Sequence, residues 1–172
     1  MIKTIKKRNS TQKRIYFDTY IEVVKFNGSY KIDLEDECFI DNHDWCITKT
    51  YKKSNSTCVC HMGKRLHRFI IKAQRGQIVD HINGDTLDNR KLNLRIVNNS
   101  QNCMNRKTSS IKRTSIYKGI YPRKNSKRWI VIIQANGKRM NFSAKTEKEA
   151  ALKYNELALK YHGEFARLNV IK

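Results

Sequence analysis

The chain has few acidic residues and no long hydrophobic run. Its 172 residues include 36 Lys and Arg but only 15 Asp and Glu, which gives a formal net charge of +21 and a pI near 10.0. The longest apolar run, residues 129–133, is much too short to span a bilayer, and no secretory hydrophobic segment follows the basic start. We therefore expect a soluble, intracellular protein that has no membrane partner and binds a polyanion, with nucleic acid favoured.

The five cysteines form an odd set without a Cys-x-x-Cys pair. This argues against a disulfide framework and for a reducing compartment. Cys58 and Cys60 would share one face of a strand and could supply two zinc ligands, but the usual pairs are missing. We expect buried thiols and no zinc. At this length the chain fits one or two small domains, none with a large core.

The segment from Asp80 to Asn102 carries the most informative pattern. Asp80 and His81 are adjacent, Asn93 follows in Leu92-Asn93-Leu94-Arg95, and Asn102 comes nine residues later. Hydrolysis of a phosphodiester requires an activated water, a charge neutraliser at the phosphate and stabilisation of the departing oxygen. Asp80 and Asn102 offer the carboxylate and amide oxygens that suit Mg²⁺, for which Mn²⁺ can substitute. His81 is the natural general base, because an imidazole can accept a proton near neutral pH.

This order and spacing resembles the HNH family, and most closely its phage and intron-encoded homing endonucleases. The resemblance implies a ββα-metal nuclease core at about residues 77–107, with Asn93 tying down the loop and orienting the histidine. In phage members a segment comparable to residues 15–73 precedes the motif, with a tryptophan like Trp45 in its core. The alternative is a small hairpin in which the asparagines are only caps and turn formers.

Local patterns place these residues on a strand, a loop, a second strand and a helix. Residues 77–81 and 94–97 are strand candidates, residues 83–85 have turn chemistry, and Asn98 is a plausible N-cap for a helix to about residue 107. Adjacent strand residues point to opposite faces. The first strand must therefore bend or end at Asp80 if Asp80 and His81 are to converge.

The remainder of the N-terminal part is less legible. Residues 1–14 carry six basic residues and no acid, and we expect a basic tail that is either solvated or a phosphate-binding arm. Residues 15–73 show short strands and turns, and the acidic stretch 33–44 matches no metal loop and favours a solvated turn and short helix. Residues 66–71 predict a short helix, in which His67 is either a structural histidine or, with Arg68, a phosphate contact.

A second module is predicted after a basic linker at residues 108–115. Residues 129–135 and 138–143 flank Asn136-Gly137, the strongest short hairpin signal, and residues 117–122 supply a third strand. Thr146 and Glu149 form a capping box, and the following helix ends at Gly163. The predicted fold class is α+β: a β-rich segment leading into the nuclease core, the linker, and a three-stranded antiparallel sheet packed on one helix.

Residues 116–170 resemble the plant ethylene-response-factor (Apetala-type) DNA-binding domain and its phage relatives. The resemblance rests on Tyr117-Lys118-Gly119-Ile120, Glu149-Ala150-Ala151 and the segment 163–169. It implies that the sheet enters the major groove of double-stranded DNA. The expected DNA-binding residues are Lys118, Tyr121, Arg123, Ile130, Ile132, Gln134, Arg139 and Asn141.

The chain departs from the plant domains at these contact positions. Ile132, Gln134 and Asn141 can touch thymine methyls or adenine edges but cannot replace guanine-reading arginines, so the plant target sequence does not transfer. The sequence predicts a site-preferring DNA endonuclease, expected in phage-infected bacterial cytoplasm, with one divalent metal ion and a histidine base. The alternative is a non-cutting DNA-binding regulator with a vestigial nuclease motif. Whether the protein is a monomer or a dimer, and whether it nicks or cuts both strands, is left open.

Overall fold

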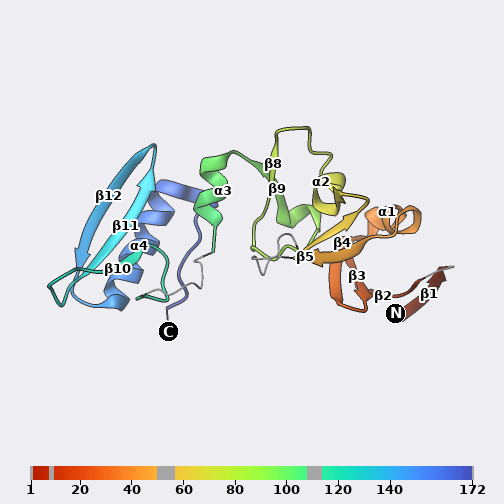
Figure 1. Cartoon of the computed structure of the whole chain (residues 1–172), viewed down its shortest axis with the longest axis horizontal. Helices are drawn as coiled ribbons and strands as arrows, with labels where there is room; N and C mark the ends of the chain where they lie inside the picture. The colour runs from red at the N-terminus through yellow and green to blue at the C-terminus, as the bar shows by residue number, and fades with distance from the viewer. Residues whose placement is uncertain (1, 8–9, 50–56, 108–113, 172) are drawn as a thin grey trace. The chain divides into compact units, whose positions relative to one another are not determined.

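The computed structural model describes residues 2–7, 10–49, 57–107 and 114–171, and side chains from residue 12 onward (Figure 1). The chain divides into two compact units, Met1–Asn98 and Asn99–Lys172. In the described ranges the strands form small antiparallel sheets with few helices, as expected for the α+β class. No helix in these ranges is long and apolar enough to cross a membrane.

The first unit opens with a four-stranded meander in the order β1-β2-β3-β4. Its strands are β1 (Ile2–Lys7), β2 (Ser10–Tyr16), β3 (Tyr20–Lys25) and β4 (Gly28–Asp33). Most of the basic segment 1–14 thus forms strands rather than a frayed tail, and its role as a phosphate-binding arm stays a prediction. The physical reason is visible at Arg14, which is fully buried and donates to the carboxylates of Glu37 at 2.8 Å and Asp41 at 2.7 Å.

Short elements follow and close the first core. They are η1 (Leu34–Asp36), α1 (Glu37–Asn42), β5 (Cys46–Lys49), β6 (Thr57–His61), β7 (Lys64–Arg65) and α2 (Leu66–Ile70). Trp45 is buried among Ile32, Ile40 and Leu66, and its indole N–H donates to the Phe39 carbonyl at 3.0 Å. The expected short helices at the acidic stretch and at residues 66–71 are confirmed.

The motif segment forms the last part of the first unit. β8 (Ile78–His81) pairs with β9 (Leu94–Val97), and η2 (Lys91–Asn93) leads into β9. Leu94 is buried in the same core as Trp45, so the hairpin is anchored on the hydrophobic centre of the unit. Both expected strands are confirmed within one residue.

The second unit contains α3 (Asn99–Asn105), β10 (Ile120–Pro122), β11 (Trp129–Ala135), β12 (Lys138–Ala144), α4 (Glu147–His162) and η3 (Gly163–Phe165). One face of the sheet β10-β11-β12 packs on α4 through Val131, Ile133, Ala151, Tyr154 and Ala158 (Figure 1). The predicted hairpin and capping box are confirmed: Asn136 and Gly137 have φ of 52° and 73°, and the Glu149 amide donates to Thr146 Oγ1 at 3.1 Å.

The third strand is shorter than the sequence predicts. Residues 117–122 were expected to be extended, but β10 begins only at Ile120 because Gly119 has φ of +74°. Gly119 lies so close to its neighbours that a Cβ there would come within 2.3 Å of Tyr154 Cε2 and 2.7 Å of the Ile132 carbonyl oxygen. The predicted linker falls mostly on residues 108–113, outside the described residues.

Candidate active site

The β8–β9 hairpin determines where the motif side chains lie. Asp80 pairs with Arg95 and His81 with Leu94, so β8 keeps its register through His81. The predicted bend at Asp80 is therefore absent from the pairing, and the chain turns one residue later, where the Gly84 amide donates to the His81 carbonyl at 2.8 Å. Because strand side chains alternate, the hairpin presents Asp80 and His81 to opposite faces.

Asp80 forms a close ion pair with Arg95. The guanidinium donates through Nε at 3.1 Å and Nη2 at 3.0 Å to one carboxylate oxygen, and the two side chains are only 11% and 12% exposed. Such a charge-assisted contact neutralises the carboxylate in a partly desolvated place. The sequence motif includes Arg95, but its ion pair with Asp80 was not predicted. The position of Arg95 opposite Asp80 across the hairpin could have indicated this pair.

His81 is nearly buried and lies beside a second imidazole. It is 6% exposed, its Nε2 is 3.4 Å from Asn89 Oδ1, and its ring meets the His67 ring edge-on at 5.0 Å between centroids. Burial lowers the pKa of His81, while the contact with Asn89 and the nearby carboxylates oppose that shift. The neutral imidazole is the form that a general base needs.

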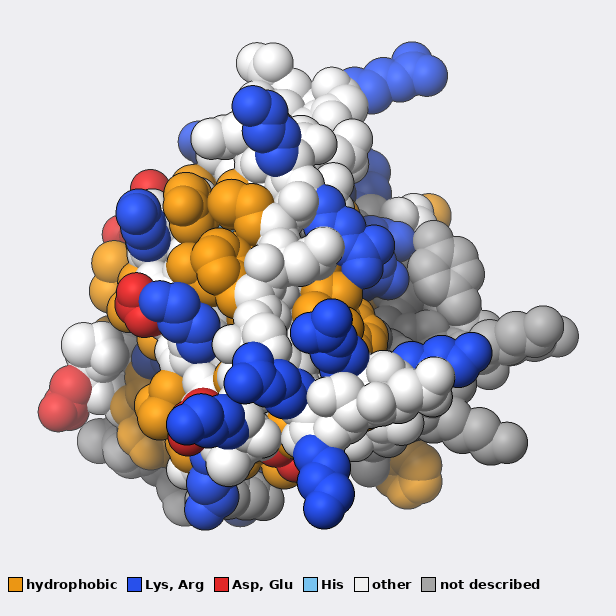
Figure 2. Space-filling model, turned by 90° about the vertical axis from the view of Figure 1, so that its left-hand side faces the viewer, with side chains coloured by type: hydrophobic (Ala, Val, Ile, Leu, Met, Phe, Trp, Pro, Cys, Tyr) orange, Lys and Arg blue, Asp and Glu red, His pale blue; other side chains and the backbone are white. Residues whose placement is uncertain are grey.

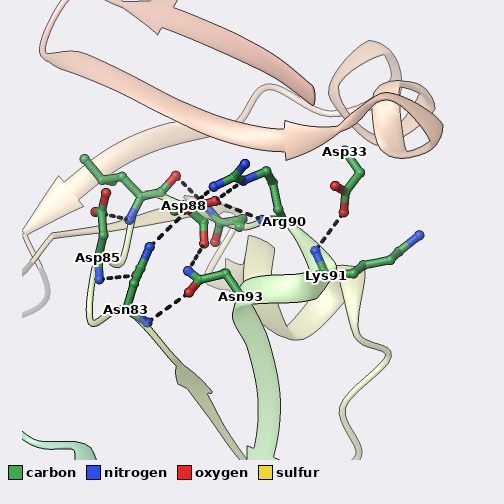
Figure 3. Close-up of polar contacts among 9 residues, drawn as sticks. Asp33, Asn83, Asp85, Asp88, Arg90, Lys91 and Asn93 are labelled. Atoms are coloured by element: carbon green, nitrogen blue, oxygen red, sulfur yellow. Dashed lines mark hydrogen bonds and ion pairs between the residues drawn. The ribbon is translucent and has the colours of Figure 1, made fainter. Parts of the chain in front are cut away.

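The loop between the strands is held by an amide network (Figure 3). The side chain of Asn93 accepts through Oδ1 from the backbone N–H of Asn83 at 3.0 Å and donates through Nδ2 to the backbone carbonyl of Asp88 at 2.8 Å. Asn83 Nδ2 in turn donates to Asp88 Oδ2 at 3.1 Å, and the Ile82 amide donates to the Asn93 carbonyl at 2.9 Å. One buried amide thus fixes both ends of the loop that begins beside His81.

Two basic residues fasten this loop to the meander. Arg90 donates to both oxygens of Asp88 at 2.7 Å, which lowers the pKa of Asp88, and its guanidinium lies 4.9 Å from the centre of the Tyr20 ring. The Lys91 amide donates to Asp33 Oδ2 at 2.7 Å (Figure 3). The backbone of Lys31 also bonds the loop, accepting from Asn89 and donating to Leu87. The sequence analysis predicted the role of Asn93 in the loop but not these contacts of Arg90, Lys91 and Lys31.

The oxygen donors of Asp80 and Asn102 suit a hard divalent cation, but they belong to different units. Asp80 lies on β8 of the first unit, whereas Asn102 lies on α3 of the second. That both residues bind one metal ion stays a prediction. A separate acidic group, Asp33, Glu35 and Asp36, is compensated by Lys91, whose ammonium is 2.5 Å from Glu35 and 3.0 Å from Asp36. We assign no cation to that group.

His67 and Arg68 make structural contacts on α2. His67 is 8% exposed, and burial lowers its pKa to about 3. Arg68 donates to the carbonyls of Gln77 at 2.5 Å and Gln74 at 2.8 Å, which ties α2 to the start of β8. A phosphate contact by either side chain stays a prediction.

The predicted DNA-binding residues lie on the C-terminal sheet and its loops. Val131 and Ile133 face α4, so Ile130, Ile132 and Gln134 lie on the outer face of β11. Lys118 differs from the rest: its ammonium donates to the Met104 carbonyl, and burial lowers its pKa to about 8. The outer-face side chains from the predicted set, in register across the sheet, are Tyr121, Ile130, Ile132, Gln134, Arg139 and Asn141.

The segment that forms this face carries charges of one sign. No Asp or Glu lies between Asp88 and Glu147 in the sequence, so the sheet, its loops and α3 carry only basic charges. Figure 2 views the molecule from the side where β10–β12 lie and shows hydrophobic side chains with Lys and Arg around them, and Asp and Glu side chains also in view. Such a surface suits a polyanion.

Comparison with known proteins identifies the motif segment. Residues 64–104 match the family model described as HNH endonuclease. An uncharacterised HNH endonuclease of Acanthamoeba polyphaga mimivirus is 32% identical over 144 residues, which cover 77% of this chain and 74% of the viral protein. Protein 3.8 of Escherichia phage T7 is 32% identical over 93 residues, covering 54% of this chain and 76% of its own. No solved structure matches. The described segment with Asp80, His81 and Asn93 lies within the matched region, and the chain belongs to the HNH endonuclease family.

Proposed function

We propose that this protein is a site-preferring DNA endonuclease of the homing type, which hydrolyses phosphodiester bonds with His81 as the general base. The observation that carries the proposal is the loop network centred on Asn93. Buried amides are costly unless they are hydrogen-bonded, and here every contact of Asn93 fixes the segment that follows His81. A fixed base is what proton transfer from a water requires.

The proposed chemistry divides among four residues of the motif. His81 accepts a proton from the attacking water, and Asn93 holds the loop so that the imidazole keeps its orientation. Asp80 and Asn102 would hold a divalent cation, Mg²⁺ or Mn²⁺, which supplies charge neutralisation at the phosphate and at the departing oxygen. Arg95 engages the Oδ2 oxygen of Asp80, so a cation that binds this oxygen would compete with the guanidinium.

The C-terminal unit is proposed to position the nuclease on double-stranded DNA. Its three-stranded sheet packs on one helix, and the basic residues Arg123 and Arg139 are exposed. Contacts to phosphates would supply most of the affinity, and contacts to base edges would supply the site preference.

A non-cutting DNA-binding regulator is the second candidate. The observation that favours it is the state of the two central groups: His81 is almost buried, and Asp80 is paired with Arg95. Both groups would need to become accessible before cleavage, and to act on one phosphate from opposite faces of the hairpin. The burial of His81 is therefore the feature that separates the two functions.

Supercoiled plasmid cleavage discriminates between the two candidates. We expect the full chain to relax or linearise plasmid with Mg²⁺ or Mn²⁺ and to lose this activity in EDTA. His81→Ala should reduce the cleavage rate by about 10²–10⁴-fold while DNA affinity changes only a fewfold, because the base is removed and the phosphate contacts stay. Binding without cleavage by the wild-type protein would support the regulator, and near-normal cutting by His81→Ala would defeat the assignment of the base.

A further inference from the structure

The distal half of the β11–β12 hairpin is a two-stranded ribbon. β10 pairs only with residues 129–131 of β11, whereas β12 pairs with all of β11. Beyond β10 the hairpin continues for four further cross-strand pairs as far as the Asn136-Gly137 turn, and at the first of them the Ile132 amide still donates to the Gly119 carbonyl at 2.7 Å. The major groove of B-DNA admits a two-stranded ribbon, so this half of the hairpin has suitable dimensions to enter it.

Two cross-strand pairs occupy the outer face of the ribbon. Ile132 lies opposite Asn141, and Gln134 lies opposite Arg139. The alternating residues Ile133 and Met140 face the core against α4, which fixes the orientation of the outer set. In residues 114–171, as the structure describes them, no hydrogen bond engages the side-chain amide of Asn141. Its donor and acceptor are available to a ligand.

The pair Ile132 and Asn141 has a defined chemical complement. An asparagine amide accepts from adenine N6 and donates to adenine N7, and an aliphatic side chain contacts the thymine 5-methyl group. Ile132 cannot form a hydrogen bond through its side chain. A guanine or cytosine edge in contact with it would therefore lose hydrogen bonds to water and gain none from the protein. The partly exposed Ile130 extends the apolar surface beside Ile132 on the same strand face.

The spacing of the pair fits neighbouring base pairs. Directly opposed side chains in an antiparallel sheet have Cβ atoms about 4.5–5.5 Å apart. Base pairs stack at about 3.4 Å along one strand, so two such side chains reach the same base pair or adjacent ones. Gln134 and Arg139 lie two residues further along each strand, roughly 7 Å away, or about two base pairs.

We infer that Ile132 and Asn141 together read A·T pairs in the major groove, Asn141 through an adenine edge and Ile132 through a thymine methyl. This inference rests on the proposed DNA-binding function of the sheet and names its substrate class: a target with A·T pairs under the ribbon rather than a guanine-rich box. The pair is the specificity-determining element, and the surrounding Lys and Arg side chains supply affinity independent of sequence.

The test begins with selection of binding sites from a randomised duplex library by the full chain, without divalent metal. We expect enriched sites to contain A·T pairs at which Asn141→Ala loses its preference. Affinities are then measured on one selected site with thymine replaced by uracil, which removes only the methyl, or with adenine replaced by 7-deazaadenine, which removes N7. The uracil change should weaken wild-type binding about fourfold, and the loss of the adenine contact should cost about 5- to 150-fold.

The decisive result is coupling between protein and DNA changes. Uracil should cost Ile132→Ala less than twofold, and 7-deazaadenine should cost Asn141→Ala little, because each variant has already lost that contact. Ile132→Val serves as a milder variant that preserves the strand, and unfolding curves check each fold. Ser143→Ala, on the same face opposite Ile130, is the matched control and should retain full sensitivity to both base changes.

The outcomes separate this inference from the proposed function. Selected sites with G·C pairs under the ribbon, no enriched site at all, or equal uracil losses in wild type and Ile132→Ala would overturn the A·T assignment. If plasmid cleavage and DNA binding persist in those cases, the endonuclease proposal stands. If the full chain neither binds duplex DNA nor cuts plasmid, the proposed function itself fails.

Discussion

Arg95 and Asp80 form a close ion pair across the motif hairpin, with the guanidinium Nε and Nη2 both within 3.1 Å of one carboxylate oxygen. The pair lies across the β8–β9 hairpin and is largely withdrawn from solvent. An arginine in this position compensates the carboxylate when no cation is bound. It also competes with a cation for the same oxygen.

Removal of Arg95 should destabilise the fold. We expect Arg95→Ala to lower the free energy of unfolding by about 3 kcal/mol, because a mostly buried carboxylate is left without its partner. The loss should be smaller when the same change is made on an Asp80→Asn background. Urea denaturation of the four proteins measures the coupling, with Arg75→Ala at an exposed position as control. Equal losses on both backgrounds would show that the ion pair contributes nothing.

His67 should make stability dependent on pH. Its pKa is about 3 in the folded protein because burial disfavours the charged ring, and about 6.5 in the unfolded chain. Above pH 6.5 the ring is neutral in both states, so His67 does not make the stability depend on pH there. Between pH 6.5 and 3 the unfolded chain alone binds the proton, and stability falls as the pH falls, by up to about 1.4 kcal/mol per pH unit.

The measurement is the free energy of unfolding between pH 7.5 and 4.5. His67→Phe should flatten the decline below pH 6.5, whereas His61→Gln, a more exposed histidine, should leave it steep. An unchanged slope in His67→Phe would mean that His67 is not the group that takes up a proton when the protein unfolds.

Gly119 should tolerate substitution much less than Gly137. Both have positive φ, but a Cβ at Gly119 would overlap Tyr154 and the Ile132 carbonyl, whereas nothing lies within 4 Å at Gly137. We expect Gly137→Ala to cost about 1–2 kcal/mol from backbone strain alone, and Gly119→Ala to cost about 1–3 kcal/mol more from overpacking. Urea denaturation monitored through the second unit compares them, and equal losses would contradict the close approach.

The sequence predicted the elements more accurately than their contacts. The hairpin at Asn136-Gly137 and the capping box at Thr146 depend on local geometry, which is determined by residues close together in the sequence. Gly119 shows the limit, because the space for a side chain there is taken by Tyr154, which lies far away in sequence. Arg14 shows the same limit in a basic segment, since its burial depends on Glu37 and Asp41.

The candidate site follows the same division. Spacing and residue type indicate Asp80, His81 and Asn93 as candidates, and their roles stay predictions. The partners that surround them could not be predicted, because Arg95, Asn89 and His67 reach the site through strand register and helix packing. Register is set by pairing between segments, which no single segment specifies.

The last prediction concerns the metal ligands. Asp80→Ala should abolish metal-dependent cleavage at every Mg²⁺ concentration, because it removes the only anionic ligand proposed and leaves Arg95 uncompensated. Asn102→Ala should raise the Mg²⁺ concentration needed for half-maximal cleavage and recover partly at high Mg²⁺ or with Mn²⁺, since loss of a neutral oxygen donor weakens a site less than loss of a carboxylate.

Plasmid cleavage is titrated with Mg²⁺ and with Mn²⁺ for both variants. Gln101→Ala, at the neighbouring position on α3, is the control for damage to the helix. Asn102 belongs to the unit that does not contain Asp80, so its result carries particular weight. If Asn102→Ala cleaves with an unchanged Mg²⁺ requirement while Asp80→Ala is inactive, Asn102 has no part in binding the cation.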